Sequence, residues 1–154
     1  GQGLSIACGV ALGAKLWGKN FRVYTIVGDG ESHEGMIWEA AIFAAHYRLD
    51  NLTAVTDQNR LMASGETIIG PLAPKWRSFG WEFREIDGHN IGEILDALDW
   101  ATDIKGRPPM IIARTVQGCG VSFAENVSTF HHTSLTPEQF EKACRELEGE
   151  VGAD

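Results

Sequence analysis

Residues 21–35 read FRVYTIVGDGESHEG, an apolar run that ends in a glycine-rich turn. The run Phe21–Val27 is rich in β-branched and aromatic residues, which predicts a strand. The turn Gly28–Gly35 leads into Met36–Tyr47, a helical pattern that is apolar on most faces, as expected of a buried helix. A strand that passes through a short turn into a helix favours an α/β protein.

The rest of the chain repeats this alternation. Three further apolar runs predict strands: Leu52–Thr56, Trp81–Ile86 and Met110–Val116. Helices are predicted at Leu4–Trp17, along the apolar stripe of Ile91, Ile94, Leu95 and Leu98, and from a Thr136-Pro137 start with the stripe of Phe140, Ala143, Cys144 and Leu147. We therefore predict a three-layer α/β/α fold with a mostly parallel sheet, in one domain over residues 1–154.

Two segments lack such patterns. Residues 65–76 contain Pro71 and Pro74 and are predicted to be a loop, and the acidic tail 148–154 is expected to fray.

Ligands of parallel α/β sheets bind outside the carboxyl ends of the strands. The segments that follow each strand are therefore the first places to search for function.

The composition narrows the class of protein. The 154 residues include 44% apolar and 22% charged residues, which is typical of a globular domain rather than a disordered or fibrous chain. The formal net charge of −8, from 13 basic and 21 acidic residues, argues against nucleic acid as a partner. No apolar run approaches the length of a membrane span, so we expect no membrane association.

The cysteines and the chain start give two further expectations. Cys8, Cys119 and Cys144 are scattered and form no CxxC pair, which fits a reducing cytoplasm and no secretory leader. Gly1 stands where a pattern is already under way, so we expect this chain to be part of a longer protein.

The turn after the first strand carries the first candidate site. Glycines let main-chain N–H groups approach a phosphate, and Asp29 between Gly28 and Gly30 offers a carboxylate oxygen to Mg²⁺. A tight turn with a capping aspartate would have the same sequence. A nicotinamide fingerprint needs a third glycine where His33 stands, so that interpretation is weak.

The second strand leads into Thr56-Asp57-Gln58-Asn59-Arg60-Leu61. Neighbouring parallel strands end side by side, so Asn59 is expected to face Asp29 and to supply a second oxygen to Mg²⁺. An Asx turn, in which the Asn59 side chain binds its own backbone, is the alternative.

These two segments resemble the thiamine diphosphate enzymes, whose signature is Gly-Asp-Gly followed just under 30 residues later by Asn. Within that superfamily the chain resembles transketolase over essentially its whole length. The matching elements are Glu34-Gly35 with Trp38-Glu39-Ala40, Tyr47-Arg48-Leu49-Asp50-Asn51-Leu52, Asn59-Arg60-Leu61, Phe79-Gly80-Trp81, Asp87-Gly88-His89-Asn90, Arg107-Pro108-Pro109 and Gly1-Gln2-Gly3-Leu4. Gln58 departs from the pattern, since it replaces a usual asparagine.

The resemblance implies roles for individual residues. Mg²⁺, or Ca²⁺, would be bound by the side chains of Asp29 and Asn59 and the main-chain carbonyl of Leu61. Thiamine diphosphate would be contacted by Gly28, Asp29, Gly30, Glu34, Asn59, Leu61 and His131. Glu34 would also serve catalysis in a carboxylate network at a subunit interface; a glutamate that complements the start of a helix is the alternative.

The glycine-rich segment Val116–Val121, with Glu125-Asn126 and Phe130-His131, matches the end of the family's domain. His131 would then lie near the diphosphate and the reacting end of the substrate, as a catalytic hydrogen-bond donor. His132 stands beside it as the competing candidate. His46 is expected to be structural, and His33 is left open as a cleft residue.

The implied activity is transfer of a two-carbon ketol unit from a ketose to an aldose, on a sugar phosphate or a related substrate. The Gly-Pro-Leu element, the substrate histidines and the pyrimidine-binding domain of the family are absent from this sequence. We therefore expect residues 1–154 to form a partial diphosphate-binding domain of a split enzyme, which works with a pyrimidine-domain chain as a two-fold complex. The alternatives are a deoxyxylulose-phosphate synthase-like or dehydrogenase E1-like subunit, and a non-catalytic interaction subunit.

Overall fold

The computed structural model describes the backbone of residues 1–151 and the side chains of residues 1–149. Its α-helices are α1 (Gln2–Leu16), α2 (Gly35–His46), α3 (Leu72–Ser78), α4 (Ile91–Asp103) and α5 (Pro137–Val151). Its strands are β1 (Val23–Gly28), β2 (Leu52–Gln58), β3 (Leu61–Met62), β4 (Gly65–Glu66), β5 (Glu82–Asp87) and β6 (Pro109–Arg114). Two 3₁₀ turns, η1 (Glu31–His33) and η2 (Ser128–His131), complete the described part.

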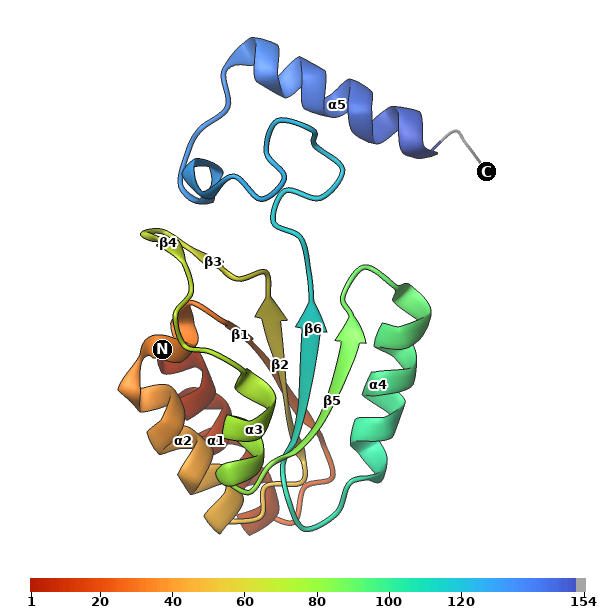
Figure 1. Cartoon of the computed structure of the whole chain (residues 1–154). Helices are drawn as coiled ribbons and strands as arrows, with labels where there is room; N and C mark the ends of the chain where they lie inside the picture. The colour runs from red at the N-terminus through yellow and green to blue at the C-terminus, as the bar shows by residue number, and fades with distance from the viewer. Residues whose placement is uncertain (152–154) are drawn as a thin grey trace.

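Four strands form one parallel sheet in the order β1-β2-β6-β5. Gly28 at the end of β1 pairs with Asp57 of β2, and Asp57 pairs with Ala113 of β6. All four strands therefore end at the same edge, and beyond it lie the β3–β4 hairpin, the segment that follows β6, and α5 (Figure 1). The prediction of a parallel α/β sheet is confirmed.

Helices cover both faces of the sheet, so the predicted three layers are present. Helices α1, α2 and α3 pack on one face, where Trp76 and Trp81 are almost fully buried with ring centroids 5.0 Å apart. Helix α4 covers the other face, over β5 and β6 (Figure 1). It leaves Ile26 on the edge strand β1 73% exposed.

The loop predicted at residues 65–76 is wrong in part, because it contains β4 and most of α3. Pro71 is the N-cap of α3 and Pro74 lies in its first turn. N–H groups of the first turn have no acceptor inside the helix, so proline is tolerated there. The tail prediction is wrong as far as Val151, because α5 continues to that residue; residues 152–154 lie outside the described part.

In α4 and α5, the residues that are buried differ from the apolar stripes predicted from the sequence. In α4 the fully buried residues are Ala97 and Ala101, whereas Ile91 is 68% exposed and Leu95 58% exposed. Alanine contributes little to an apolar pattern but allows a helix to approach the sheet closely. In α5 only Ala143 of the predicted stripe is buried, and Phe140 is exposed.

Helix α2 is buried on one side only. It packs through Ile37, Ala41 and Ala44, while Ile42 is 54% exposed. No helix among residues 1–151 is long and apolar enough to span a membrane.

Candidate functional site

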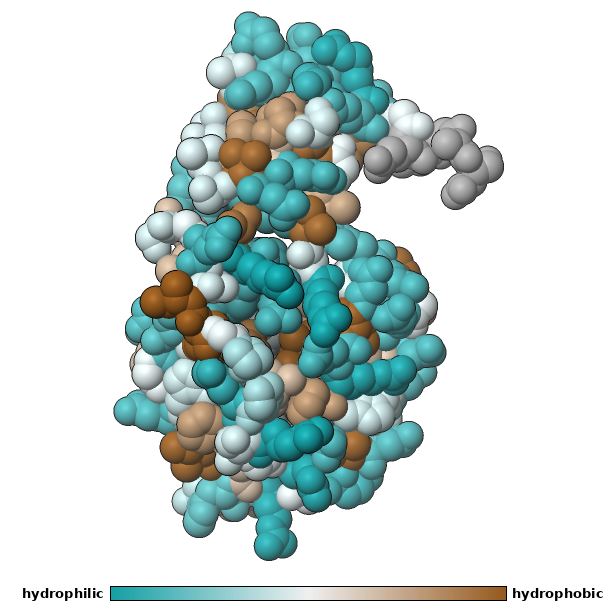
Figure 2. All heavy atoms as spheres, viewed as in Figure 1, coloured by the Kyte–Doolittle hydropathy of each residue, from teal (hydrophilic) through white to brown (hydrophobic). Residues whose placement is uncertain are grey.

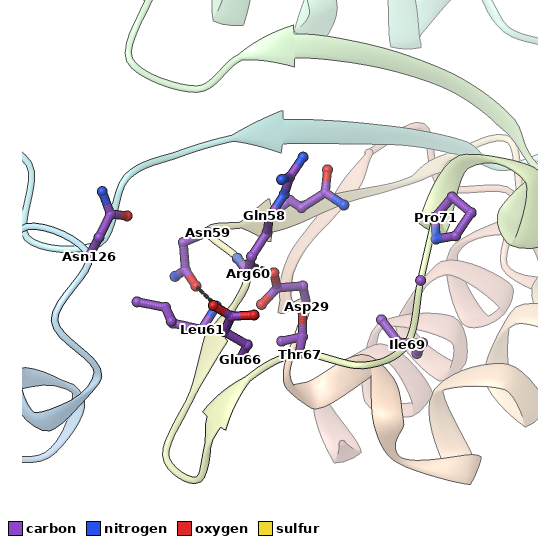
Figure 3. Close-up of a pocket in the computed structure, with 11 residues that line it drawn as sticks. Asp29, Gln58, Asn59, Arg60, Leu61, Glu66, Thr67, Ile69, Pro71 and Asn126 are labelled. Carbon is purple, nitrogen blue, oxygen red and sulfur yellow. Dashed lines mark hydrogen bonds between the residues drawn. The ribbon is translucent and has the colours of Figure 1, made fainter.

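A cavity of about 580 Å³ lies where β1 and β2 end (Figure 3). Outside it, the surface is hollowed between the sheet and the segment that carries α5, and hydrophilic side chains gather around the hollow (Figure 2). The lining residues come from the ends of both strands, the β3–β4 hairpin, the chain that leads to α3, and the segment after β6. They are Asp29, Gln58, Asn59, Arg60, Leu61, Glu66, Thr67, Ile69, Gly70, Pro71 and Asn126.

Asp29 lies directly after β1 and is only 2% exposed. Its Oδ1 accepts a hydrogen bond from the N–H of Gly30 at 2.7 Å, and its Oδ2 accepts one from the N–H of Arg60 at 2.6 Å. The second bond joins the turn after β1 to the turn after β2, so the side-by-side arrangement expected of these two segments is present. Each carboxylate oxygen retains a further lone pair.

The buried position of Asp29 disfavours the charged form of its carboxyl group. Burial raises the pKa of Asp29 above its ordinary value and the nearby Asp57 adds to the rise, while hydrogen bonds from Arg60 and Gly30 oppose it. Within residues 1–149, no lysine or arginine forms an ion pair with Asp29. A bound cation would supply the positive charge that this carboxylate lacks.

Asn59 lines the same cavity, but its amide oxygen is already in use. Oδ1 accepts a hydrogen bond from the N–H of Leu61 at 2.8 Å (Figure 3), which is the Asx turn considered as the alternative. The turn passes through Arg60, whose φ of 65° is in the left-handed region. One lone pair of the Asn59 oxygen is still available, so the turn and a metal contact are compatible.

The turn Gly28–Gly35 is held by hydrogen bonds from its own side chains and from Trp38 of α2. The hydroxyl of Ser32 donates to the carbonyl of Gly28 at 3.1 Å, and the indole of Trp38 donates to the carbonyl of Ser32 at 2.9 Å. The N–H of Gly28 donates to Glu31 Oε2 at 3.2 Å. The N–H groups expected to contact a phosphate at Gly28 and Gly30 are therefore bound within the turn, to Glu31 and to Asp29.

Gly30 allows a close approach between this turn and the hairpin. A Cβ atom at Gly30 would lie 2.8 Å from Cβ of Met62 and 3.7 Å from the carbonyl oxygen of Leu61. The carbonyl of Leu61 thus lies beside the turn, near Asp29. Asp29, Asn59 and Leu61 offer one carboxylate, one amide and one main-chain oxygen, which is a donor set that suits Mg²⁺ or Ca²⁺. No cluster of three His, Cys, Asp or Glu side chains suited to a metal exists within the described residues.

The histidines fall into different places. His131 ends η2, which packs against β3 beside the cavity, but His131 does not line the cavity. The His132 ring lies edge-on to that of His131 with centroids 5.0 Å apart. His33 joins two walls of the site, because its Nδ1 lies 3.0 Å from the carbonyl of Gly30 and its Nε2 accepts from the N–H of Ile68. His46 is exposed and stacks edge-on against Tyr47.

Glu34 is not brought into the cavity. It is the exposed N-cap of α2, makes no side-chain capping bond, and its Cβ would lie 3.0 Å from a Cβ at Gly1. The position fits the helix-start alternative, and a role at a subunit interface stays a prediction.

A family model described as the transketolase thiamine diphosphate binding domain matches residues 1–150. The chain belongs to the transketolase family. It is 47% identical, over 97% of its length, to 6-deoxy-6-sulfo-D-fructose transketolase subunit SqwG of Clostridium sp. strain MSTE9. It is 40% identical, again over 97% of its length, to one of the subunits of apulose-4-phosphate transketolase from Actinobacillus succinogenes. The aligned chain spans only 56% and 55% of these two relatives.

The fold also matches solved transketolases. The structure of transketolase from Campylobacter jejuni superposes with a TM-score of 0.89 at 29% identity, covering 95% of this chain and 24% of that chain. Leishmania mexicana transketolase gives a TM-score of 0.84 at 26% identity, with the same coverage of both chains.

Sequence reasoning missed several residues of this transketolase-family site. Asn126 stands in the sequence only as part of a motif, yet it lines the cavity with a left-handed φ of 56°. The wall formed by Thr67, Ile69 and Pro71 gives no signal, because it belongs to a stretch without periodicity that predicts no more than a loop.

Closing the gap at Gly30 should weaken cofactor binding in this transketolase-family domain. In Gly30→Ala the new Cβ must displace Met62, and overpacking of this kind destabilises a fold by about 1–3 kcal/mol. Relief of the clash moves the hairpin, and with it the Leu61 carbonyl, away from the turn that carries Asp29, so we expect weaker metal-dependent binding. The control is Gly35→Ala in the same turn, where a Cβ would meet nothing within 4 Å. Calorimetric titration with thiamine diphosphate should show weaker binding for the first variant alone; equal affinities would contradict the close-approach model.

Proposed function

We propose that this chain is the diphosphate-binding part of a transketolase-like enzyme that transfers a two-carbon ketol unit from a ketose to an aldose. The observation that carries the proposal is Asp29, a buried carboxylate at the carboxyl end of a parallel sheet that forms no ion pair with a lysine or arginine among residues 1–149. The names of its relatives support it, since two of them are subunits of transketolases that act on a sulfosugar and on a sugar phosphate. A sugar phosphate or a related anionic sugar is the substrate class we propose.

The residues at the cavity fit a metal–diphosphate group. Asp29, Asn59 and the carbonyl of Leu61 would hold Mg²⁺ or Ca²⁺, and diphosphate oxygens and water would complete the coordination. The close approach at Gly30 leaves room only for main chain between the turn and the hairpin. When bound, thiamine diphosphate supplies the carbanion and the electron sink. The chain's share is to bind the diphosphate, to orient it, and to place His131 beside it.

The proposal includes a partner chain that carries the pyrimidine-binding domain. Large apolar side chains are exposed on α1, on α2 and on the residue that follows each helix, which is typical of an interface. They are Ile6, Val10, Leu16, Trp17, Met36, Ile42, Phe43 and Tyr47. We propose that this surface packs in a two-fold complex, with Glu34 at its border.

Reconstitution tests the proposed function. The full-length chain, the candidate pyrimidine-domain chain and the two together are assayed for ketol transfer with thiamine diphosphate and Mg²⁺. We expect no turnover from either chain alone, since one domain leaves half of the cofactor site open to water, and turnover from the mixture that is lost on chelation of the metal. Full turnover by this chain alone would refute the split site. If no mixture is active, a non-catalytic subunit is the better assignment.

A further inference from the structure

Gln117 follows β6 and binds three parts of the segment that passes beside the cavity. Its main-chain carbonyl accepts from the N–H of Asn126 at 3.0 Å. Its side-chain Nε2 donates to the carbonyl of Val127 at 3.3 Å, and its Oε1 lies 3.1 Å from Nδ1 of His131. One residue therefore connects the main chain of the cavity-lining Asn126 with the candidate catalytic histidine.

These contacts determine which nitrogen of His131 carries the proton. The carbonyl of Val127 can only accept, so the NH₂ group of Gln117 must face Val127 and the amide oxygen must face His131. An amide oxygen can only accept as well. Nδ1 of His131 is therefore the protonated nitrogen, and in the neutral ring Nε2 is left as an acceptor.

Nε2, on the other edge of the His131 ring, is available to bind a ligand. Among the described residues, Nε2 of His131 has no hydrogen-bond partner. The ring lies at the end of η2, and η2 packs against β3, whose Leu61 lines the cavity.

We propose that Gln117 is a positioning residue that fixes His131 in the Nδ1–H tautomer and so leaves Nε2 as the acceptor with which this histidine meets the cofactor or substrate. The proposal rests on the proposed function insofar as His131 works at the cofactor. It has a chemical consequence: neutral His131 accepts a proton or hydrogen bond at Nε2, and it donates to a phosphate or oxyanion only after it has become an imidazolium.

The first test reads the tautomer directly, without cofactor. In the assembled enzyme with ¹⁵N-histidine in this chain only, long-range ¹H–¹⁵N spectra are recorded at a pH where the rings are neutral, and the His131→Ala variant assigns the signal. We expect Nδ1–H in the wild type and a change toward Nε2–H in Gln117→Met, which keeps the side-chain length but removes both polar groups. Gln117→Glu should preserve Nδ1–H, since a carboxylate oxygen still accepts from it. Gln2→Met, at an exposed position of α1, is the control.

An Nε2–H signal in the wild type, or an Nδ1–H signal that persists in Gln117→Met, would overturn the proposal. Neither result depends on whether the enzyme transfers ketol units, so failure here is distinct from failure of the proposed function.

The second test asks whether the effect on turnover passes through His131. We expect Gln117→Met to lower turnover roughly tenfold, part of the ~10²–10⁴-fold that a placed acid–base group contributes. In a His131→Ala background the same change should have no further effect, because the group being positioned is gone. Additive losses would show that Gln117 acts elsewhere and would contradict the proposal.

Discussion

Asp29→Ala should abolish metal-dependent binding of thiamine diphosphate in the assembled enzyme. The change removes the only charged member of the proposed ligand set, and with it the buried negative charge that favours a cation. It also leaves the N–H groups of Gly30 and Arg60 without their acceptor, which costs less than it would for fully buried donors because both bonds are only partly buried. The fold should survive with a lower melting temperature.

Calorimetric titration of thiamine diphosphate, with Mg²⁺ and with chelator, measures this effect. The matched control is Asp87→Ala, because Asp87 ends β5 at the same edge of the sheet but is exposed and does not line the cavity. The control should bind the cofactor as the wild type does, and thermal unfolding should confirm that both variants are folded. Unchanged affinity in Asp29→Ala would remove the metal site from this cavity.

His131→Ala should lower turnover by roughly 10²-fold, the low end for a positioned acid–base or oxyanion group. His132→Ala should change it much less, since Gln117 holds only the first of the two rings. Steady-state ketol transfer with both variants measures the difference. Because the two rings are in contact, edge to face with centroids 5.0 Å apart, each loss should be compared with that of the double variant. If His132→Ala has the larger effect, then His132 rather than His131 is the histidine that approaches the cofactor.

The apolar periods of the chain were enough to predict the architecture and the edge of the sheet at which function was to be sought. The spacing of apolar residues that indicates a strand or a helix is local, so it can be read from the sequence alone. Parallel strands joined through helices must then end at one edge of the sheet. This is why Asp29 and Asn59, which are 30 positions apart, could be expected in one place, and both line the cavity. Their role as metal ligands stays a prediction.

The finer contacts became visible only in the folded chain. That Ala97 rather than Leu95 faces the sheet depends on how α4 lies against β5 and β6. The sequence left the Asx turn at Asn59 as one of two alternatives, and it gave no sign of the bond that His131 donates to Gln117. Both depend on side-chain rotamers, and a single hydrogen bond of this kind contributes only about 1 kcal/mol. Energies this small leave no trace in an apolar pattern, and they join residues that only the tertiary structure brings together.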